Sequence, residues 1–511
     1  MRLLHFFCLP LTAIAVFAQT PAPSSQSSQQ SPPVGYVAPL FNATTRNVIL
    51  DAVVTDKKGN VVTGLTRNEF AIREDNSPQE IRSFDAVTAG AAAEEATPHT
   101  ILLVDELNTH FEDMAYTRYS VNRLLHHDGV QLDQPTALYI LSNDGLHVLQ
   151  NYTRDPAAID AALHSHKAVL PWRLRRNFYL ALDRINISMS ALDQIAIANS
   201  GVPGHKNIVW ISPGLPLFGG LELTGDSEKQ LFDSIRHLSD QLLKARISIY
   251  SVDPRGVGSQ FGPTNFASSD LAYTAYLNGL SDASDAAFGN LAIQALATQT
   301  GGHAFYGRND VDREIATSLT DGDTYYTLAY SPSNKDFHGE FRKVRITVID
   351  RPDLKVQTRE GYYAIPDNQP ADPKRDLQEL AGSLLTPIPF NGVPIPTSDI
   401  KLFKSPVPHI SVRFVVPSTS LSWRQDAKGG LSSQVSIAGA DRTKHGAWKA
   451  SIVRVYTVSL PGGTSPSART LTSMTFEMPY RDSNHLRFVL RDDTSGHVGS
   501  SEIEIDPSRI S

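Results

Sequence analysis

The pattern of hydrophobic and polar positions divides the chain into regions with different periods. Residues 41–90 contain short alternating runs separated by turn residues, which predicts a small β module. Residues 97–366 alternate short apolar runs with longer amphipathic stretches, which predicts strands followed by helices. Residues 401–511 return to strand-like alternation with spacings typical of a β-sandwich. The polar, proline-bearing residues 367–400 are expected to form a linker.

The central region predicts an α/β fold with a doubly wound, mostly parallel sheet covered by helices on both faces. Buried strands are expected at Ile101–Asp105, Ala137–Leu141, Asn207–Ile211, Ile247–Tyr250 and Tyr325–Tyr330. Right-handed crossovers would then bring Asp105, Ser212 and Asp253, which end three of these strands, to one edge of the sheet. The alternating segment Lys343–Ile349 is expected to pair with Tyr325–Tyr330 as an antiparallel terminal hairpin.

The first residues are typical of an export signal. Met1-Arg2 is positively charged, residues 3–17 are almost wholly apolar, and the small residues around Ala18 predict cleavage after it, so residues 1–18 form the signal peptide. The apolar run, at roughly 15 residues, is shorter than the about 20 of a membrane-spanning helix. An uncleaved anchor is the alternative. Residues 19–40, rich in Ser, Gln and Pro, are expected to be a flexible leader. The protein is therefore expected in the periplasm, at the cell surface or outside the cell.

The composition and the motifs exclude several kinds of site from this protein's expected functions. The single cysteine, Cys8, lies in the predicted signal peptide, so the mature chain would have neither disulfides nor thiolate sites. The net charge is −7 with no basic stripe, and nucleic acid is therefore not an expected partner. No Gly-x-Ser-x-Gly, His-Glu-x-x-His or Gly-x-Gly-x-x-Gly pattern occurs where an enzyme would need it. His126-His127-Asp128 is interpreted as a solvated helix end, because neighbouring helical residues point about 100° apart. We expect no enzymatic activity and no cofactor.

Several segments in fixed order resemble the von Willebrand factor A-related proteins abundant in acidobacteria. They are ILLVDELNT, GHKNIVWISPGLP, ISIYSVDPRG, TGGHAFY, YYTLAYSPSN and LKVQTREGYY, within about residues 45–365. The resemblance implies a von Willebrand factor A-like α/β domain, a fold used mostly to bind other proteins.

Typical members of that superfamily bind Mg²⁺ through an Asp-x-Ser-x-Ser loop, a threonine from a second loop and an aspartate from a third. Asp105 matches the leading aspartate, Thr109 can replace the last serine, and Asn108 offers an oxygen one residue out of register. Leu107 stands at the middle hydroxyl position, Pro213-Gly214 replaces the third-loop aspartate, and residues 167–176 contain arginines but no threonine. The resemblance therefore implies a degenerate metal site, in which Asp105 caps the turn that follows its strand. Mg²⁺ bound by Asp105 and Thr109 stays open as an alternative.

A partner surface is expected at the strand-end edge and in the insertion after it. Ser212, Asp253 and Arg255 join Asp105 at this edge, and residues 256–287 are polar with spaced aromatic residues, a composition typical of recognition loops. These aromatic residues are Phe261, Phe266, Tyr273 and Tyr276, which could instead only fix the loop to the domain. The sequence thus predicts an exported, non-enzymatic module that binds a protein partner. The alternatives are an Mg²⁺-dependent adhesion module and an exported hydrolase with an unrecognised site.

Overall fold

The structure is a computed structural model in which the chain forms two compact units, within residues 44–388 and 389–511. It describes residues 47–87, 97–126, 132–168, 178–214, 225–255, 293–305, 309–320, 324–366, 373–404, 406–425, 430–443, 448–461, 463–481 and 483–505. The predicted signal peptide and leader lie outside these residues. None of the described helices is long and apolar enough to cross a membrane.

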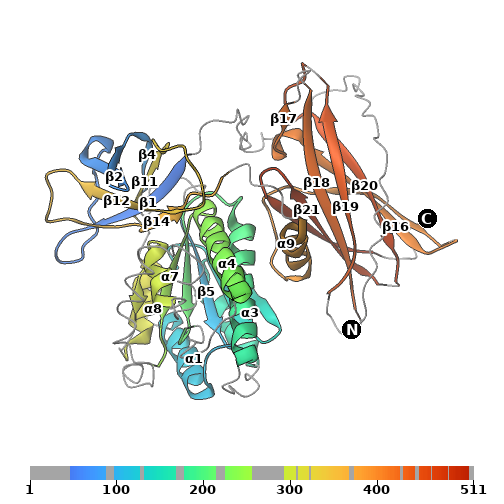
Figure 1. The fold of residues 1–511 in the computed structure, drawn as a ribbon. Helices are drawn as coiled ribbons and strands as arrows, with labels where there is room; N and C mark the ends of the chain where they lie inside the picture. The colour runs from blue at the N-terminus through green and yellow to red at the C-terminus, as the bar shows by residue number, and fades with distance from the viewer. Residues whose placement is uncertain are drawn as a thin grey trace, which may run out of the picture. The chain divides into compact units, whose positions relative to one another are not determined.

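A six-stranded sheet with the order β10-β9-β8-β5-β6-β7 forms the centre of the first unit (Figure 1). Its strands are β5 (His99–Asp105), β6 (Thr136–Ser142), β7 (Gly145–Thr153), β8 (Lys206–Ile211), β9 (Ile247–Val252) and β10 (Ala304–Phe305). All neighbours are parallel except β6 and β7, which run antiparallel. The predicted α/β class with a mostly parallel sheet is confirmed. Since β6 and β8 flank β5 on opposite sides, the winding reverses at β5, and a crevice is expected where β5 and β8 end.

Helices cover both faces of this sheet. Helices α1 (Phe111–Leu125), α2 (Pro156–Ser165) and α8 (Val311–Thr320) share one core with alternate strand residues such as Leu102, Val104 and Ile140. Helices α3 (Phe178–Asn199) and α4 (Gly225–Lys244) pack together on the other side (Figure 1), and α7 (Ile293–Gln299) contacts β9. The apolar stripe of α4 is buried, at Leu231, Ile235, Leu238 and Leu242.

The small β region contains two sheets, and each combines strands from the beginning of the first unit with strands from its carboxyl-terminal part. One sheet has the order β13-β1-β11-β4, with β13 (Lys355–Gln357), β1 (Val48–Thr55), β11 (Tyr325–Tyr330) and β4 (Ile81–Val87). The other has the order β14-β12-β2-β3, with β14 (Gly361–Tyr363), β12 (Phe341–Val348), β2 (Phe70–Glu74) and β3 (Ser77–Gln79). A short 3-10 helix, Arg67–Glu69, precedes β2.

One prediction about this region is wrong. The hairpin between Tyr325–Tyr330 and Lys343–Ile349 does not form, because β11 pairs with β1 and β4 while β12 pairs with β2 and β14. The β module of residues 41–90 is part of this larger β region. Its apolar residues share one core with Tyr326, Tyr330 and Ile346, because so short a segment cannot bury two sheet faces alone.

The second unit consists of two antiparallel sheets around a common core. One contains β15 (Thr397–Phe403), β16 (His409–Pro417) and β20 (Leu471–Pro479). The other contains β17 (Arg424–Gln425), β18 (Leu431–Arg442), β19 (Trp448–Leu460), β21 (His485–Asp492) and β22 (Val498–Glu504). A 3-10 helix, Ser418–Ser420, follows β16. Phe414 and Phe476 of the first sheet pack against Phe488 of the second, with ring centroids 5.3 and 5.8 Å apart.

Part of the predicted linker is regular structure instead. Helix α9 (Pro373–Leu385) occupies its first half and β15 begins within its second half. The helix forms because Leu380 and Leu384, one turn apart, are both buried, and it contacts α3 of the same unit.

Candidate functional site

The carboxyl ends of β5, β8 and β9 form a polar rim at the point where the winding of the sheet reverses. As predicted, the residues that end these strands share one edge. The Ser212 hydroxyl donates to Asp105 Oδ2 at 2.6 Å, and the Arg255 guanidinium donates to the Pro213 carbonyl at 3.1 Å. We call this edge, with Asp105, Asn108, Thr109, Arg184, Ser212, Asp253 and Arg255, the strand-end rim.

Asp105 is the buried centre of the rim and is fully shielded from solvent. Its Oδ1 accepts the Asn108 backbone N–H at 2.8 Å, which closes the turn after β5 as predicted. Its Oδ2 accepts the Asn108 side-chain amide at 2.8 Å and the Trp210 indole N–H at 3.3 Å, in addition to Ser212. Burial raises the pKa of Asp105, although these hydrogen bonds act to lower it. Both oxygens are therefore already used by protein donors.

These residues do not suit a divalent cation. Both Asp105 oxygens accept N–H or O–H donors, and Leu107, at the middle hydroxyl position, is buried. The positively charged guanidinium of Arg184 also lies close enough to Asp105 to attract its carboxylate, and it would repel a cation at the same place. One feature favours a metal: the Thr109 hydroxyl is buried without a hydrogen-bond partner among the described residues. Within the same described ranges, no group of three His, Cys, Asp or Glu side chains has the geometry to hold a metal.

Arg184 of α3 occupies the rim in a way that the sequence did not reveal. Its Nε donates to Asn108 Oδ1 at 3.0 Å, while its terminal nitrogens meet no acceptor in the part of the chain that the structure describes. Burial lowers the pKa of Arg184, and the attraction of Asp105 opposes that change. The hydrophobic period of a helix does not indicate which of its polar residues faces the strand ends.

Asp253 and Arg255 form the other half of the rim. The Asp253 carboxylate, 3% exposed, accepts the Arg255 Nε at 2.9 Å and its terminal nitrogen at 2.7 Å. Burial acts to lower the pKa of Arg255, but Asp253 outweighs it and the pKa is raised. Nearby, burial raises the pKa of Asp113 on α1. The rim thus combines buried carboxylates with two arginines that reach toward solvent.

The remaining predicted residues lie elsewhere or outside the described part. Phe261, Phe266, Tyr273 and Tyr276 fall outside the described residues, as does most of the loop 167–176. His126 ends α1, and its Nδ1 lies 3.0 Å from the Asn122 carbonyl, which is the helix-end role that was predicted.

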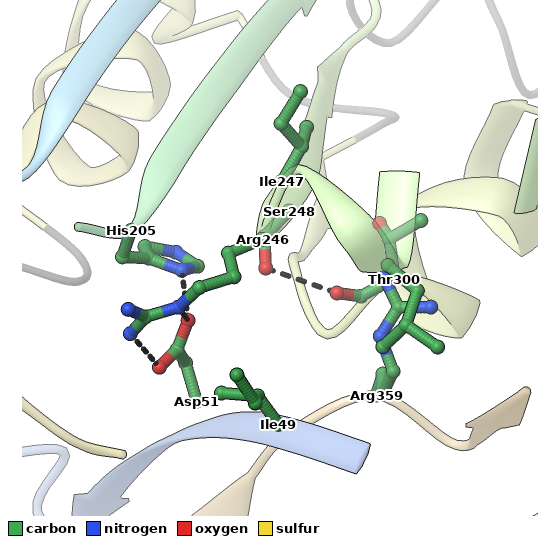
Figure 2. Close-up of a pocket in the computed structure, with 9 residues that line it drawn as sticks. Ile49, Asp51, His205, Arg246, Ile247, Ser248, Thr300 and Arg359 are labelled. Carbon is green, nitrogen blue, oxygen red and sulfur yellow. Dashed lines mark hydrogen bonds and ion pairs between the residues drawn. The ribbon is translucent and has the colours of Figure 1, made fainter. Parts of the chain in front are cut away.

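A second polar site lies at the opposite, amino-terminal edge of the sheet, where β1 meets the start of β8 and β9 (Figure 2). Asp51 of β1 accepts hydrogen bonds from Arg246 at 2.5 Å and from Thr327 at 2.8 Å, and lies 2.9 Å from His205 Nδ1. Burial acts to raise the pKa of Asp51, but Arg246 and His205 hold it well below its usual range. Sequence reasoning missed this site because its members are far apart in the chain and stand outside any recognisable pattern.

The fold and the rim define an α/β protein with a doubly wound, mostly parallel sheet. No family model matches the sequence, and no curated protein is similar to it. Among solved structures, the SpRpn10 VWA domain is 14% identical over 35% of this chain and 95% of that one, with a TM-score of 0.17. An uncharacterized membrane spanning protein from Vibrio fischeri is 15% identical over 43% and 97%, with a TM-score of 0.12. Neither similarity is close enough to indicate a function.

Proposed function

We propose that this chain is an exported, non-enzymatic protein-binding module built on a von Willebrand factor A-like domain. Its strand-end rim binds an acidic group of a protein partner through Arg184 and Arg255, without a divalent ion. The doubly wound sheet and the segments that resemble von Willebrand factor A-related proteins support the domain type. The apolar amino terminus, residues 3–17, supports export.

The observation that carries the proposal is the hydrogen bonding of the Arg184 guanidinium. Its Nε is fixed by Asn108, so the guanidinium plane is held in place, while its terminal N–H groups have no acceptor among the described residues. A guanidinium with two free parallel donors matches a carboxylate in geometry and charge. Because the group is already ordered, a partner would lose little side-chain entropy on binding it.

Arg255 supports the same proposal from the other side of the rim. Its side chain is 30% exposed although it is paired with Asp253, so one edge of the guanidinium remains accessible. Residues 256–287, the insertion predicted to contribute recognition contacts, follow Arg255 directly in the sequence. A loop that starts there can add contacts to a partner bound by the two arginines.

A second candidate function is an Mg²⁺-dependent adhesion module that uses Asp105 and Thr109. The buried, partnerless hydroxyl of Thr109 favours it, since a metal ion would supply the missing contact. Mg²⁺ would then have to displace the donors that now satisfy Asp105.

Affinity capture from an envelope extract tests the proposal. The tagged full-length chain should retain the same partner in EDTA and in Mg²⁺. Arg184→Gln should weaken capture roughly tenfold, the value of a charge-assisted hydrogen bond of about 1.5 kcal/mol. The matched control is Arg82→Gln on β4, which removes a side chain that is 59% exposed and forms an ion pair with the exposed Glu80.

The two candidates give opposite results. Capture that disappears in EDTA, together with Mg²⁺ binding heat that is lost in Asp105→Ala, would replace our proposal by the adhesion module. Retention of no protein, or equal capture by Arg184→Gln and Arg82→Gln, would contradict the arginine rim.

A further inference from the structure

Arg359 is a buried cation that forms no hydrogen bond through its NH1 nitrogen in the part of the chain that the structure describes. The residue is 6% exposed. The nearest opposite charges, Asp51 and Asp240, attract it only at longer range. Both are already paired, Asp51 with Arg246 and Asp240 with Lys244 at 2.7 Å.

This arrangement is costly unless something else satisfies the charge. Burying an unpaired ion costs several kcal/mol, which is why buried charges in proteins are almost always paired. Burial lowers the pKa of Arg359 to about 10, so the guanidinium remains charged at neutral pH. Among the described residues, this positive charge therefore lacks a carboxylate of its own, because Asp51 and Asp240 are paired with other cations.

Arg359 lines a small pocket, and contacts with β1 and with a glycine turn hold its backbone there (Figure 2). The Thr358 hydroxyl donates to the Asp51 carbonyl at 2.8 Å and holds the adjacent backbone against β1. Gly301, at φ +90°, allows the close approach, since a Cβ there would lie 2.7 Å from the Arg359 backbone nitrogen. The strand and the glycine turn together fix Arg359 in the pocket wall.

Size and charge limit what can enter. The pocket has room for only one or two water-sized particles, and Ile49, Leu243 and Ile247 supply apolar walls. Asp51 lines the same pocket and would repel a dianion. A small monovalent anion meets both limits.

We propose that this pocket binds a monovalent anion of halide size, chloride, through the Arg359 guanidinium. The anion completes the charge balance where β1 and the 358–359 backbone meet the amino ends of β8 and β9. This site is independent of the strand-end rim and of its partner.

Chloride NMR on the full chain tests the site. The ³⁵Cl line should broaden in the presence of the protein and sharpen again when bromide is added in excess. Arg359→Gln should remove most of the broadening. The matched control is Arg345→Gln, which removes an exposed arginine on β12 and should leave the line width unchanged.

Thermal unfolding gives a second measure. At constant ionic strength, replacing gluconate by chloride should raise the Tm of the wild-type chain saturably, by roughly 2 °C or more, and should leave Arg359→Gln unchanged. If that variant fails to fold, crystals of the wild-type chain grown in bromide should show an anomalous peak within hydrogen-bond distance of the Arg359 guanidinium. Equal line broadening in wild type and Arg359→Gln, or a pocket that contains only water in such crystals, would overturn the proposal.

Discussion

A carboxylate at the end of a parallel strand can hold either a ligand or its own loop, and Asp105 holds its own loop. The side chain accepts four hydrogen bonds while fully buried, which links the turn after β5 to the end of β8. Removing the carboxylate would leave the Asn108 backbone N–H, the Trp210 indole N–H and the Ser212 hydroxyl without this acceptor, and buried donors left unsatisfied cost more free energy than the lost bonds alone.

We therefore expect Asp105→Ala to destabilise the protein by about 3 kcal/mol, and to do so equally with and without Mg²⁺. Urea denaturation followed by tryptophan fluorescence measures this, because Trp210 donates to the same carboxylate. Asp183→Ala, which removes an exposed aspartate on α3, should change stability by less than about 0.5 kcal/mol. A destabilisation seen only when Mg²⁺ is present would show that Asp105 is a ligand.

At the scale of single elements, helix α9 is held to its neighbours by one half-buried histidine. His237 of α4 lies 3.0 Å from Glu379 of α9 and 3.4 Å from Asp193 of α3. Burial acts to lower the pKa of His237, but the two carboxylates outweigh it and raise the pKa to about 10. The imidazolium thus joins three helices by ion pairs.

The pH dependence follows from the direction of this shift. A pKa raised above its unfolded value of about 6.5 stabilises the fold fully below pH 6.5, and the stabilisation is lost as the pH rises toward 10. We expect the unfolding free energy of the wild-type chain to fall between these values by a few kcal/mol. In His237→Gln the decline should be much smaller. Denaturant titrations at a series of pH values test this, and equal slopes in both proteins would contradict it.

At the scale of the whole molecule, strands from the beginning and from the end of the first unit pair in the same sheets. Strand β11 lies between β1 and β4, and the buried Tyr326, Leu328 and Tyr330 pack in a core with residues from β1, β2 and β4. The second unit has a core made only of residues from 393 onward. The two units should therefore be separable, but the first cannot be shortened to its α/β part.

Fragments test this organisation. A fragment of residues 44–388 should be a monomer that unfolds cooperatively, whereas residues 97–366, the domain boundaries predicted from sequence, should aggregate because β11 loses both neighbours. Residues 389–511 should fold alone. Size-exclusion chromatography and thermal melts followed by circular dichroism decide the matter, and a stable, monomeric 97–366 fragment would show that the shared β region is dispensable.

The amino-acid sequence by itself determined the local features. The apolar runs at 101–105 and 207–211 predicted buried parallel strands, and the stripe of α4 predicted its inner face, because these patterns depend only on the repeat of a strand or helix. The turn-capping role of Asp105 followed from its place at a strand end. The same reasoning brought Asp105, Ser212 and Asp253 to one edge, since parallel strands all end on the same side.

Only the tertiary structure decided which distant segments meet. The pairing of β1 with β11, the arginine that covers Asn108, and the pocket of Asp51, His205 and Arg359 join residues far apart in the chain. A periodic pattern tells which face of an element is buried but not what buries it. Contacts of this kind are chosen by the packing of the whole unit, in which each buried charge and each sheet edge must find a partner.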